Sequence, residues 1–390
     1  MSKMGFNEKW ISLIMMCVRS VRYSILVNGF PQGLITLSRG IRQGDPISPY
    51  LFLPCAEALS SMLYKAREDG VLTGVPTSKK GPELSHLFFA DDNLLFCRAS
   101  LSQWNQLYFI LHQYEVASGQ KMNTNKIGIF FSKNTLFVVK DLIQGVAGIS
   151  SSQRYDTYLG LPAIVGRSKT VAFKSIRERV WKRFQDWKIK FLSQVGKEIL
   201  LKAVIQAIPT YCMGMFKIPK SLCSEILSLM LRFFWGRKEK EKGIHWMNWE
   251  KLGLSKNSGG LGFWELACFN KALLAKQIWR MWKTLESLIA KIIKAKYHPE
   301  CSILEAPLGG KPSFAWRSIQ SSSELVRDGL IWRVGNGKSI QIWGNKWLVV
   351  PSTFEVQSVP KVLDQFAIVD KLIDEDLKWW NKPLLDQIFS

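Results

Sequence analysis

The first 160 residues alternate between short stretches of period two and longer stretches of helical period. Apolar and polar residues alternate in residues 21–40, around Asn28-Gly29, and again in residues 87–99; both patterns are typical of β-hairpins. Helical spacing runs over residues 7–20 and 101–118. We therefore expect an α+β domain over residues 1–160, in which an antiparallel sheet carries helices on one face.

A Gly-rich loop between these stretches leads into another predicted helix. Asp45-Pro46 and Ser48-Pro49 each combine an N-cap residue with a proline at the first helical position, so the helix is expected to begin at one of them. Residues 121–131 and 154–161 add two short strand-like pieces.

The pattern changes after Gly166. Apolar residues recur with spacings of 3, 4, 4 and 3 on one side of a predicted helix, and basic residues fill its other faces; the apolar positions are Phe173, Ile176, Val180, Phe184 and Trp187. Further helices are predicted over 197–208, 221–235 and 265–282. We expect a mainly helical, basic domain over 161–300, and a C-terminal region over 301–390 with a β-hairpin near 331–343, around Gly335-Asn336-Gly337.

Composition supports a globular protein. The chain has 390 residues, of which 47% are hydrophobic and 22% charged, enough for one large domain or two to three ordinary ones. The longest nearly apolar run, residues 11–18, is far below the roughly 20 residues that span a bilayer, so neither a membrane span nor membrane binding is expected. The seven cysteines form no CxxC pair, which indicates a reduced, intracellular protein without a zinc site.

The positive charge is unevenly distributed. Residues 1–150 carry a net charge of +5, residues 151–300 a net +17, and residues 301–390 none. A basic block of this size is typical of proteins that bind a polyanion, and nucleic acid is the leading candidate. The alternative is that these basic residues form a solvated surface that binds no polyanion.

Two adjacent carboxylates, Asp91 and Asp92, lie between two apolar runs. Unit charges about 4 Å apart repel each other by roughly 4 kcal/mol at the effective dielectric of a partly buried site, so a cation is expected beside them. A hairpin turn holding two carboxylates suits Mg²⁺, whose ligands are hard oxygens. Aspartate is also common in turns for conformational reasons alone. The two aspartates by themselves therefore do not distinguish a metal site from an ordinary turn.

Three segments in order carry a family resemblance: GIRQGDPISPYLF from residue 40, FADD from residue 89, and SGQKMNTNKIGIFFS from residue 118. They resemble motifs B, C and D of the palm of reverse transcriptases from plant LINE-type (non-LTR) retrotransposons. YLGLP from residue 158 resembles motif E, and later strings resemble the thumb and the C-terminal connection. The resemblance implies an RNA-directed DNA polymerase, a nucleotidyltransferase, and makes residues 1–160 a partial palm and 161–300 a thumb-like domain.

The resemblance also implies roles for individual residues. Asp91 and Asp92 would hold Mg²⁺ or Mn²⁺, and Lys126 would act near the leaving pyrophosphate unless it is merely a solvated lysine. The loop residues expected against the incoming dNTP and the template are Arg42, Gln43 and Gly44, and those expected along the nucleic-acid backbone are Lys182, Arg183 and Lys188. The tryptophans of the basic helix, Trp181 and Trp187, are expected in the core. The implied partners are an RNA template and an RNA–DNA duplex; no obligate protein partner is evident, and the nucleus is the compartment the family suggests.

One expected ligand does not occur in the sequence. Polymerases of this family carry a third carboxylate in motif A, upstream of motif B, whereas residues 1–40 contain no aspartate and a single acidic residue, Glu8. We expect an internal, truncated fragment that binds the metal weakly and is inactive alone, because charge stabilisation is usually the largest catalytic effect. The alternatives are a noncatalytic nucleic-acid-binding remnant and a partial palm that does not fold stably.

Overall fold

The computed structural model describes the following parts of the chain: residues 1–36, 44–123, 125–149, 157–166, 168–187, 192–236, 246–349, 353–360, 362–374, 377 and 379–389. The chain divides into two compact units. Unit 1 comprises residues 1–164 and 291–299, and unit 2 comprises residues 165–290 and 300–390. The division into three domains at residues 160 and 300 stays a prediction.

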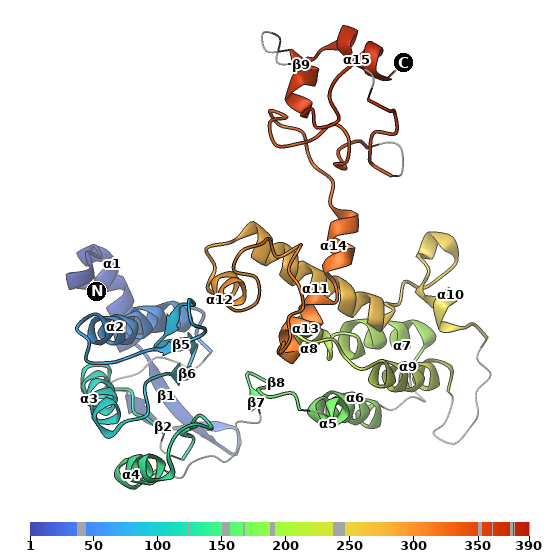
Figure 1. Cartoon of the computed structure of the whole chain (residues 1–390). Coiled ribbons are helices and arrows are strands. Elements are labelled where there is room, and N and C mark those ends of the chain that lie inside the picture. Colours follow the sequence, from blue (N-terminus) through green and yellow to red (C-terminus); the bar gives the residue numbers. More distant parts are fainter. Residues whose placement is uncertain are drawn as a thin grey trace. The chain divides into compact units, whose positions relative to one another are not determined.

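Unit 1 mixes helices with short antiparallel strand pairs (Figure 1). Its helices are a 3-10 turn Ser2–Met4, α1 (Glu8–Arg19), α2 (Ser48–Glu68), α3 (Leu101–Ser118) and α4 (Phe137–Ala147), with α12 (Leu288–Tyr297) entering it from residue 291. Its strands are β1 (Arg22–Val27), β2 (Phe30–Thr36), β3 (Val75–Pro76), β4 (Glu83–Leu84), β5 (His86–Phe89), β6 (Asp92–Leu95), β7 (Thr157–Tyr158) and β8 (Leu161–Pro162).

Local signals set most of these boundaries. The Asn7 side chain accepts a hydrogen bond from the Lys9 backbone N–H at 2.9 Å and caps α1. Ser100 caps α3 in the same way, and the helix covers the predicted range 101–118 with Gly119 as its C-cap. Asn28 and Gly29 form the turn between β1 and β2. These predicted elements are therefore confirmed.

The core of unit 1 lies where α2 meets α3. It consists of buried residues from both helices and Leu72 between them, with Phe88 and Leu95 of the β5–β6 hairpin packed against it; the buried set is Leu59, Leu63, Ala66, Leu72, Leu107, Ile110 and Tyr114. Every sheet assigned in the described residues has two strands. The α+β class is confirmed, with pairs of strands in place of one wide sheet. Residues 125 and 126, expected in a strand, lie in a turn instead.

Unit 2 is mainly helical (Figure 1). Its helices are α5 (Lys169–Ala172), α6 (Lys174–Asp186), α7 (Gln194–Leu200), a π-helical turn Leu201–Ile205, α8 (Thr210–Met213), α9 (Lys220–Trp235), α10 (Trp249–Gly253), a 3-10 turn Lys256–Ser258, α11 (Leu266–Lys283), α13 (Phe314–Gln320), α14 (Ser323–Gly329), a 3-10 turn Val369–Leu372 and α15 (Lys382–Phe389); β9 (Ile373–Asp374) pairs with β10 (Trp379–Trp380). No helix among the described residues is long and apolar enough to cross a membrane.

Helix α11 contacts α8, α9, α13 and α14, and one buried side chain on it fixes the loop between α8 and α9. Asn270 donates to the carbonyl oxygens of Met213 and Phe216 at 2.8 and 3.0 Å, and its own oxygen accepts from the Ile218 N–H at 2.8 Å. All polar atoms of this buried amide are thus used, as burial requires.

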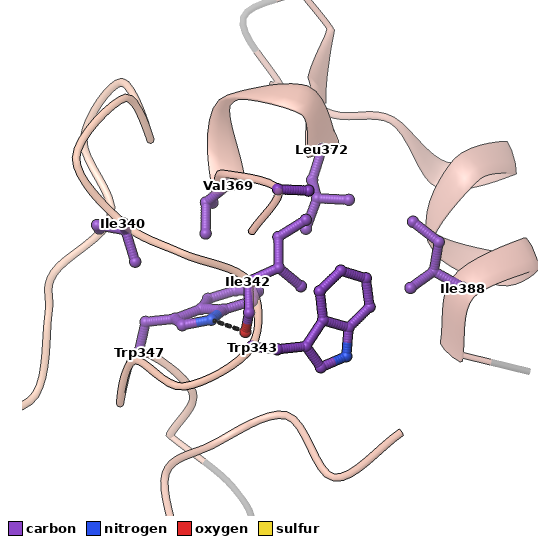
Figure 2. Close-up of a cluster of buried hydrophobic side chains, with 8 residues drawn as sticks. Ile340, Ile342, Trp343, Trp347, Val369, Leu372 and Ile388 are labelled. Atoms are coloured by element: carbon purple, nitrogen blue, oxygen red, sulfur yellow. Dashed lines mark hydrogen bonds between the residues drawn. The ribbon is translucent and has the colours of Figure 1, made fainter. Parts of the chain in front are cut away.

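The last 60 residues build a core of their own around Trp343 and Trp347, both shown in Figure 2, with Trp380 packed against it. Trp343 and Trp347 face Val369 and Leu372 from the 3-10 turn, Ile388 comes from α15, and Trp380 stacks on Trp347 with ring centroids 5.9 Å apart. The Trp347 indole N–H donates to the Ile342 carbonyl at 3.0 Å, so its one polar atom is satisfied.

The prediction of a β-hairpin near 331–343 was wrong. Residues 331–349, all of which the structure describes, contain no strand, and Gln341 forms a single bridge with Ile368. Val369 donates to the Ile340 carbonyl at 2.8 Å and Ile342 donates to the Ala367 carbonyl at 2.9 Å. The alternation of apolar and polar residues therefore indicated which residues are buried. Their backbone hydrogen-bond partners come from a distant segment.

Candidate active site at the β5–β6 turn

The two adjacent aspartates lie at the tip of the β5–β6 hairpin. The strands pair antiparallel with Phe89 opposite Asp92, which leaves Ala90 and Asp91 as the two turn residues. Ala90 has a φ of 50°, in the left-handed region that residues with a Cβ rarely adopt. Such a conformation has an energetic cost and is concentrated at functional sites. The turn thus places two carboxylates at adjacent positions at the end of a paired ladder.

The two faces of this hairpin have different surroundings. Phe88 and Leu95 pack against the α2/α3 core. Because side chains alternate along a strand, Phe89 and Asp92 belong to the opposite face. Phe89 is 61% exposed, and both aspartates are exposed. The predicted buried surroundings of the aspartates are therefore confined to one side of the hairpin.

His86 connects the base of this hairpin to α2. Its Nε2 lies 3.0 Å from the Ser60 hydroxyl and its Nδ1 lies 2.9 Å from the Ser85 hydroxyl. Tyr64 contacts the ring edge-on, with ring centroids 5.1 Å apart. Burial, and next the positive charge of Arg67, lower the pKa of His86. Both effects favour the neutral imidazole, which lies between two hydroxyls and positions the strand that carries the turn.

The two carboxylates offer the hard oxygen ligands that a divalent cation prefers. In the part of the chain that the structure describes, the carboxylates of Asp91 and Asp92 form no ion pair and no side-chain hydrogen bond, which leaves their oxygens available. Two carboxylates, with water or phosphate oxygens added, fit a magnesium ion, which usually keeps several waters. No group of three or more His, Cys, Asp or Glu residues suited to a metal occurs among the described residues.

The other residues predicted around the site are placed only in part. Gly44 has a φ of 81°, a conformation that favours glycine, whereas Arg42 and Gln43 lie outside the described residues. Asp45 accepts a hydrogen bond from the Ile47 N–H at 3.0 Å, a local turn contact just before α2. Lys126 is exposed in the turn after α3, and within the described ranges no ion pair joins it to either aspartate.

Two of the three predicted backbone-binding residues lie on α6. Lys182 and Arg183 are exposed and pair with no carboxylate in the described segments, while Lys188 lies outside them. Other cations of α6 are engaged: Lys174 pairs with Glu178 at 3.2 Å, and Arg177 with Glu225 of α9 at 2.8 Å. The free charge of this helix is therefore concentrated toward its C-terminal end.

The expectation that Trp181 of α6 and Trp187 after it are buried was wrong for Trp181, which is 50% exposed. It follows Val180 by one position and so points about 100° away from the buried stripe. Trp187 is half-buried, and its ring centroid lies 5.3 Å from that of Phe233.

Comparison with known proteins decides the family. Residues 1–193 match the family described as reverse transcriptase (RNA-dependent DNA polymerase). This range contains the Asp91-Asp92 turn and the predicted residues of the loop before α2, of the turn after α3 and of α6. The chain belongs to the reverse transcriptase family.

Three plant proteins share parts of this reverse transcriptase. An uncharacterized mitochondrial protein of Arabidopsis thaliana is 39% identical over 144 residues, 37% of this chain and 94% of that protein. A putative ribonuclease H protein of the same plant is 30% identical over 230 residues, 58% of this chain. A second uncharacterized mitochondrial protein is 55% identical over 67 residues, 17% of this chain. The alignments span only 37% and 55% of the latter two proteins.

Family membership fixes the general chemistry. A reverse transcriptase of a retroelement binds a nucleic-acid template and a deoxynucleoside triphosphate, and it uses divalent metal ions. Sequence reasoning missed His86, because four scattered histidines carried no pattern. Its two serine partners are 26 residues and one residue away, and only the nearer one is visible in the sequence.

Proposed function

We propose that this chain is the nucleic-acid-binding palm and thumb portion of an RNA-directed DNA polymerase from a plant LINE-type (non-LTR) retrotransposon. The observation that carries the proposal is the Ala90-Asp91 turn, which holds two available carboxylates at the tip of a hairpin in a chain of this family. Its partners would be an RNA template, an RNA–DNA duplex and dNTP, and its compartment the nucleus.

Asp91 and Asp92 would hold Mg²⁺ or Mn²⁺, which supplies neutralisation of phosphate charge when bound. Arg42, Gln43 and Gly44 would pack against the nucleotide and the template, and the left-handed φ of Gly44 supports a close backbone approach there. Lys126 would act near the leaving pyrophosphate, and its exposure in a turn supports access to a phosphate. Lys182, Arg183 and Lys188 would contact the backbone of the duplex.

We propose further that this metal site is weak. Two carboxylates gather at the turn, and residues 1–40 supply no aspartate to join them. A two-metal polymerase must stabilise both the attacking and the leaving oxygens. With an incomplete ligand set, this chain would bind template and primer without extending the primer at a useful rate.

The test combines binding with primer extension. Purified full chain is mixed with an oligo(dT)-primed poly(rA) template and labelled dTTP, with Mg²⁺ or with Mn²⁺. We expect binding of the primed template that weakens steeply with salt, and no incorporation above background. Incorporation by the wild type that Asp91→Asn abolishes would refute the weak-site proposal and establish an active polymerase.

Failure to bind the primed template at low salt would refute the nucleic-acid-binding function. Mn²⁺ titration monitored by electron paramagnetic resonance tests the metal ligands separately from catalysis. We expect the wild type to retain more bound Mn²⁺ than the Asp91→Asn and Asp92→Asn variants. The control is Asp69→Asn at the end of α2, which should bind Mn²⁺ like the wild type because this exposed residue is outside the turn.

A further inference from the structure

Helix α11 has one face in the core and one face in solvent. The buried face includes Leu274, Ile278 and Met281, which pack within unit 2. The exposed face carries four side chains at positions i, i+3, i+4 and i+7, which form one continuous stripe on an α-helix. These residues, the α11 stripe, are Lys276, Trp279, Arg280 and Lys283.

The charge of the α11 stripe is uncompensated. Residues 266–283 contain no acidic residue, and across the described ranges no carboxylate lies within 4 Å of the three cations. On α6, by contrast, two basic residues are paired with Glu178 and Glu225. Favourable interaction with the helix dipole accounts for cations in the last turn, Arg280 and Lys283, but not for Lys276 one turn earlier.

An aromatic platform lies in the middle of this positive stripe. Trp279 is 42% exposed, and Trp282 supports it with ring centroids 5.4 Å apart. The Lys283 Nζ lies 5.9 Å from the Trp279 ring centroid. The exposed ring is flanked by three cations, which would repel a cationic partner and attract an anionic one.

We propose that the α11 stripe is a binding site for single-stranded RNA, in which an unpaired base stacks on Trp279 and the flanking phosphates contact Lys276, Arg280 and Lys283. Proteins that bind single strands combine these two elements, an aromatic stacking platform and basic residues along the backbone. The site lies beyond residues 1–193, the range that matches the family, and does not depend on the metal site.

The exposed ring is what selects a single strand over a duplex. In a duplex both faces of each internal base are covered by neighbouring bases, so an indole on a helix surface cannot stack on them. Duplex binding needs only phosphate contacts, which Lys182 and Arg183 of α6 would already provide. An acidic protein would satisfy the charges of the α11 stripe but would leave the indole without a planar partner.

Fluorescence anisotropy of the full chain with a labelled 12-nucleotide oligo(U) tests the site. We expect Trp279→Ala to weaken binding by about tenfold with little change in salt dependence, since stacking is lost and no charge is removed. We expect the triple variant Lys276→Gln, Arg280→Gln, Lys283→Gln to reduce the slope of log affinity against log salt by about 2, at roughly 0.7 per contact on a single strand.

Matched controls come from the electrically neutral C-terminal region. Trp332→Ala removes an indole that is 43% exposed, and a triple glutamine variant of Lys311, Arg333 and Lys338 removes the same charge; both should bind oligo(U) like the wild type. Asp91→Asn should also leave this binding unchanged, which separates the α11 stripe from the polymerase site. Unchanged thermal unfolding confirms that each variant is folded.

Three outcomes would overturn the proposal. The first is wild-type affinity in Trp279→Ala. The second is an equal loss of affinity for oligo(U) and for an RNA–DNA duplex in that variant, because stacking is not available in the duplex. The third is competition by polyglutamate as effective as competition by unlabelled oligo(U), which would indicate an acidic protein as the partner.

Discussion

The Nε2 of His86 lies 3.0 Å from the hydroxyl of Ser60, a contact that joins strand β5 to helix α2. His86 begins the strand that ends at the Ala90-Asp91 turn. The position of the two carboxylates therefore depends on an imidazole four residues before the turn. Protonation of this ring would add a charge near Arg67 in a half-buried place.

The His86 contact predicts a dependence of stability on pH. Burial and Arg67 lower the pKa of His86 in the folded state, so the unfolded chain binds more protons as the pH falls. The stabilisation is complete above the unfolded pKa of about 6.5, and it decreases as the pH falls toward the lower folded pKa. Hydrogen exchange of the β5–β6 amides at pH 7 and pH 5 should show faster opening at pH 5.

The control for His86 is His112, which is exposed on α3. His112→Gln should keep the pH dependence, whereas His86→Gln should flatten it. Equal protection of the β5–β6 amides at both pH values in the wild type would contradict the expectation.

On α6, we expect cations that are paired with a carboxylate and cations that are not to contribute differently to duplex binding. Lys182→Gln with Arg183→Gln should reduce the salt slope for an RNA–DNA duplex by about 2, because each unpaired cation contributes about 0.9. Arg177→Gln should change the slope far less, since Glu225 already neutralises this guanidinium at 2.8 Å. Anisotropy titrations between 50 and 200 mM salt measure both slopes. A larger effect from Arg177→Gln would argue against backbone contacts by Lys182 and Arg183.

We expect a side chain at position 337 to destabilise the C-terminal core. A Cβ atom at this position would come within 2.4 Å of the Asp370 backbone nitrogen, and the φ of 73° disfavours any side chain. Gly337→Ala should destabilise this core by about 3 kcal/mol. Near-ultraviolet circular dichroism of the tryptophans during thermal unfolding would detect the loss.

Two residues away, Gly335 provides the matched control for Gly337. Its Cβ position is open and its φ lies outside the left-handed region, so Gly335→Ala should leave the unfolding temperature of the C-terminal core unchanged. The same unfolding temperature in both variants would mean that the close approach of Gly337 to Asp370 does not form.

We expect the ion pair of Glu198 with Lys202 to make a second contribution to stability, which is lost in acid. Its carboxylate lies 2.6 Å from the Lys202 Nζ, and Lys202 also donates to the Leu261 carbonyl. The hydrogen bond from Lys202 lowers the pKa of Glu198, so the stabilisation is present above the ordinary carboxyl pKa of about 4.3 and is lost as the pH falls below it. Glu198→Gln should cost about 2 kcal/mol at pH 7, measured by chemical denaturation.

The exposed pair Lys174–Glu178 provides the comparison for Glu198. Its two side chains are 65% and 62% exposed, so Glu178→Gln should change the free energy of unfolding by less than about 0.5 kcal/mol. If Glu198→Gln costs no more than Glu178→Gln, burial of the Glu198–Lys202 pair is not stabilising.

Local sequence determined much of this protein. Helical spacing starts at residues 7 and 101, and α1 and α3 begin beside these positions, where Asn7 and Ser100 cap them. The Asp91-Asp92 hairpin and the basic character of α6 were equally readable, because turns, caps and one-sided patterns depend on residues within a few positions of one another.

Only the tertiary structure decided which distant segments meet. Ile340 and Ile342 share an alternating pattern that indicated a local hairpin, yet their backbone partners are Ala367 and Val369. His86 could not be linked to Ser60 from the sequence, because nothing local marks a contact 26 residues away. Alternation reports that a residue is buried, whereas the choice of partner depends on the packing of the whole unit. That packing placed His86 against Ser60, which positions the aspartate turn, and it left the α11 stripe exposed to solvent.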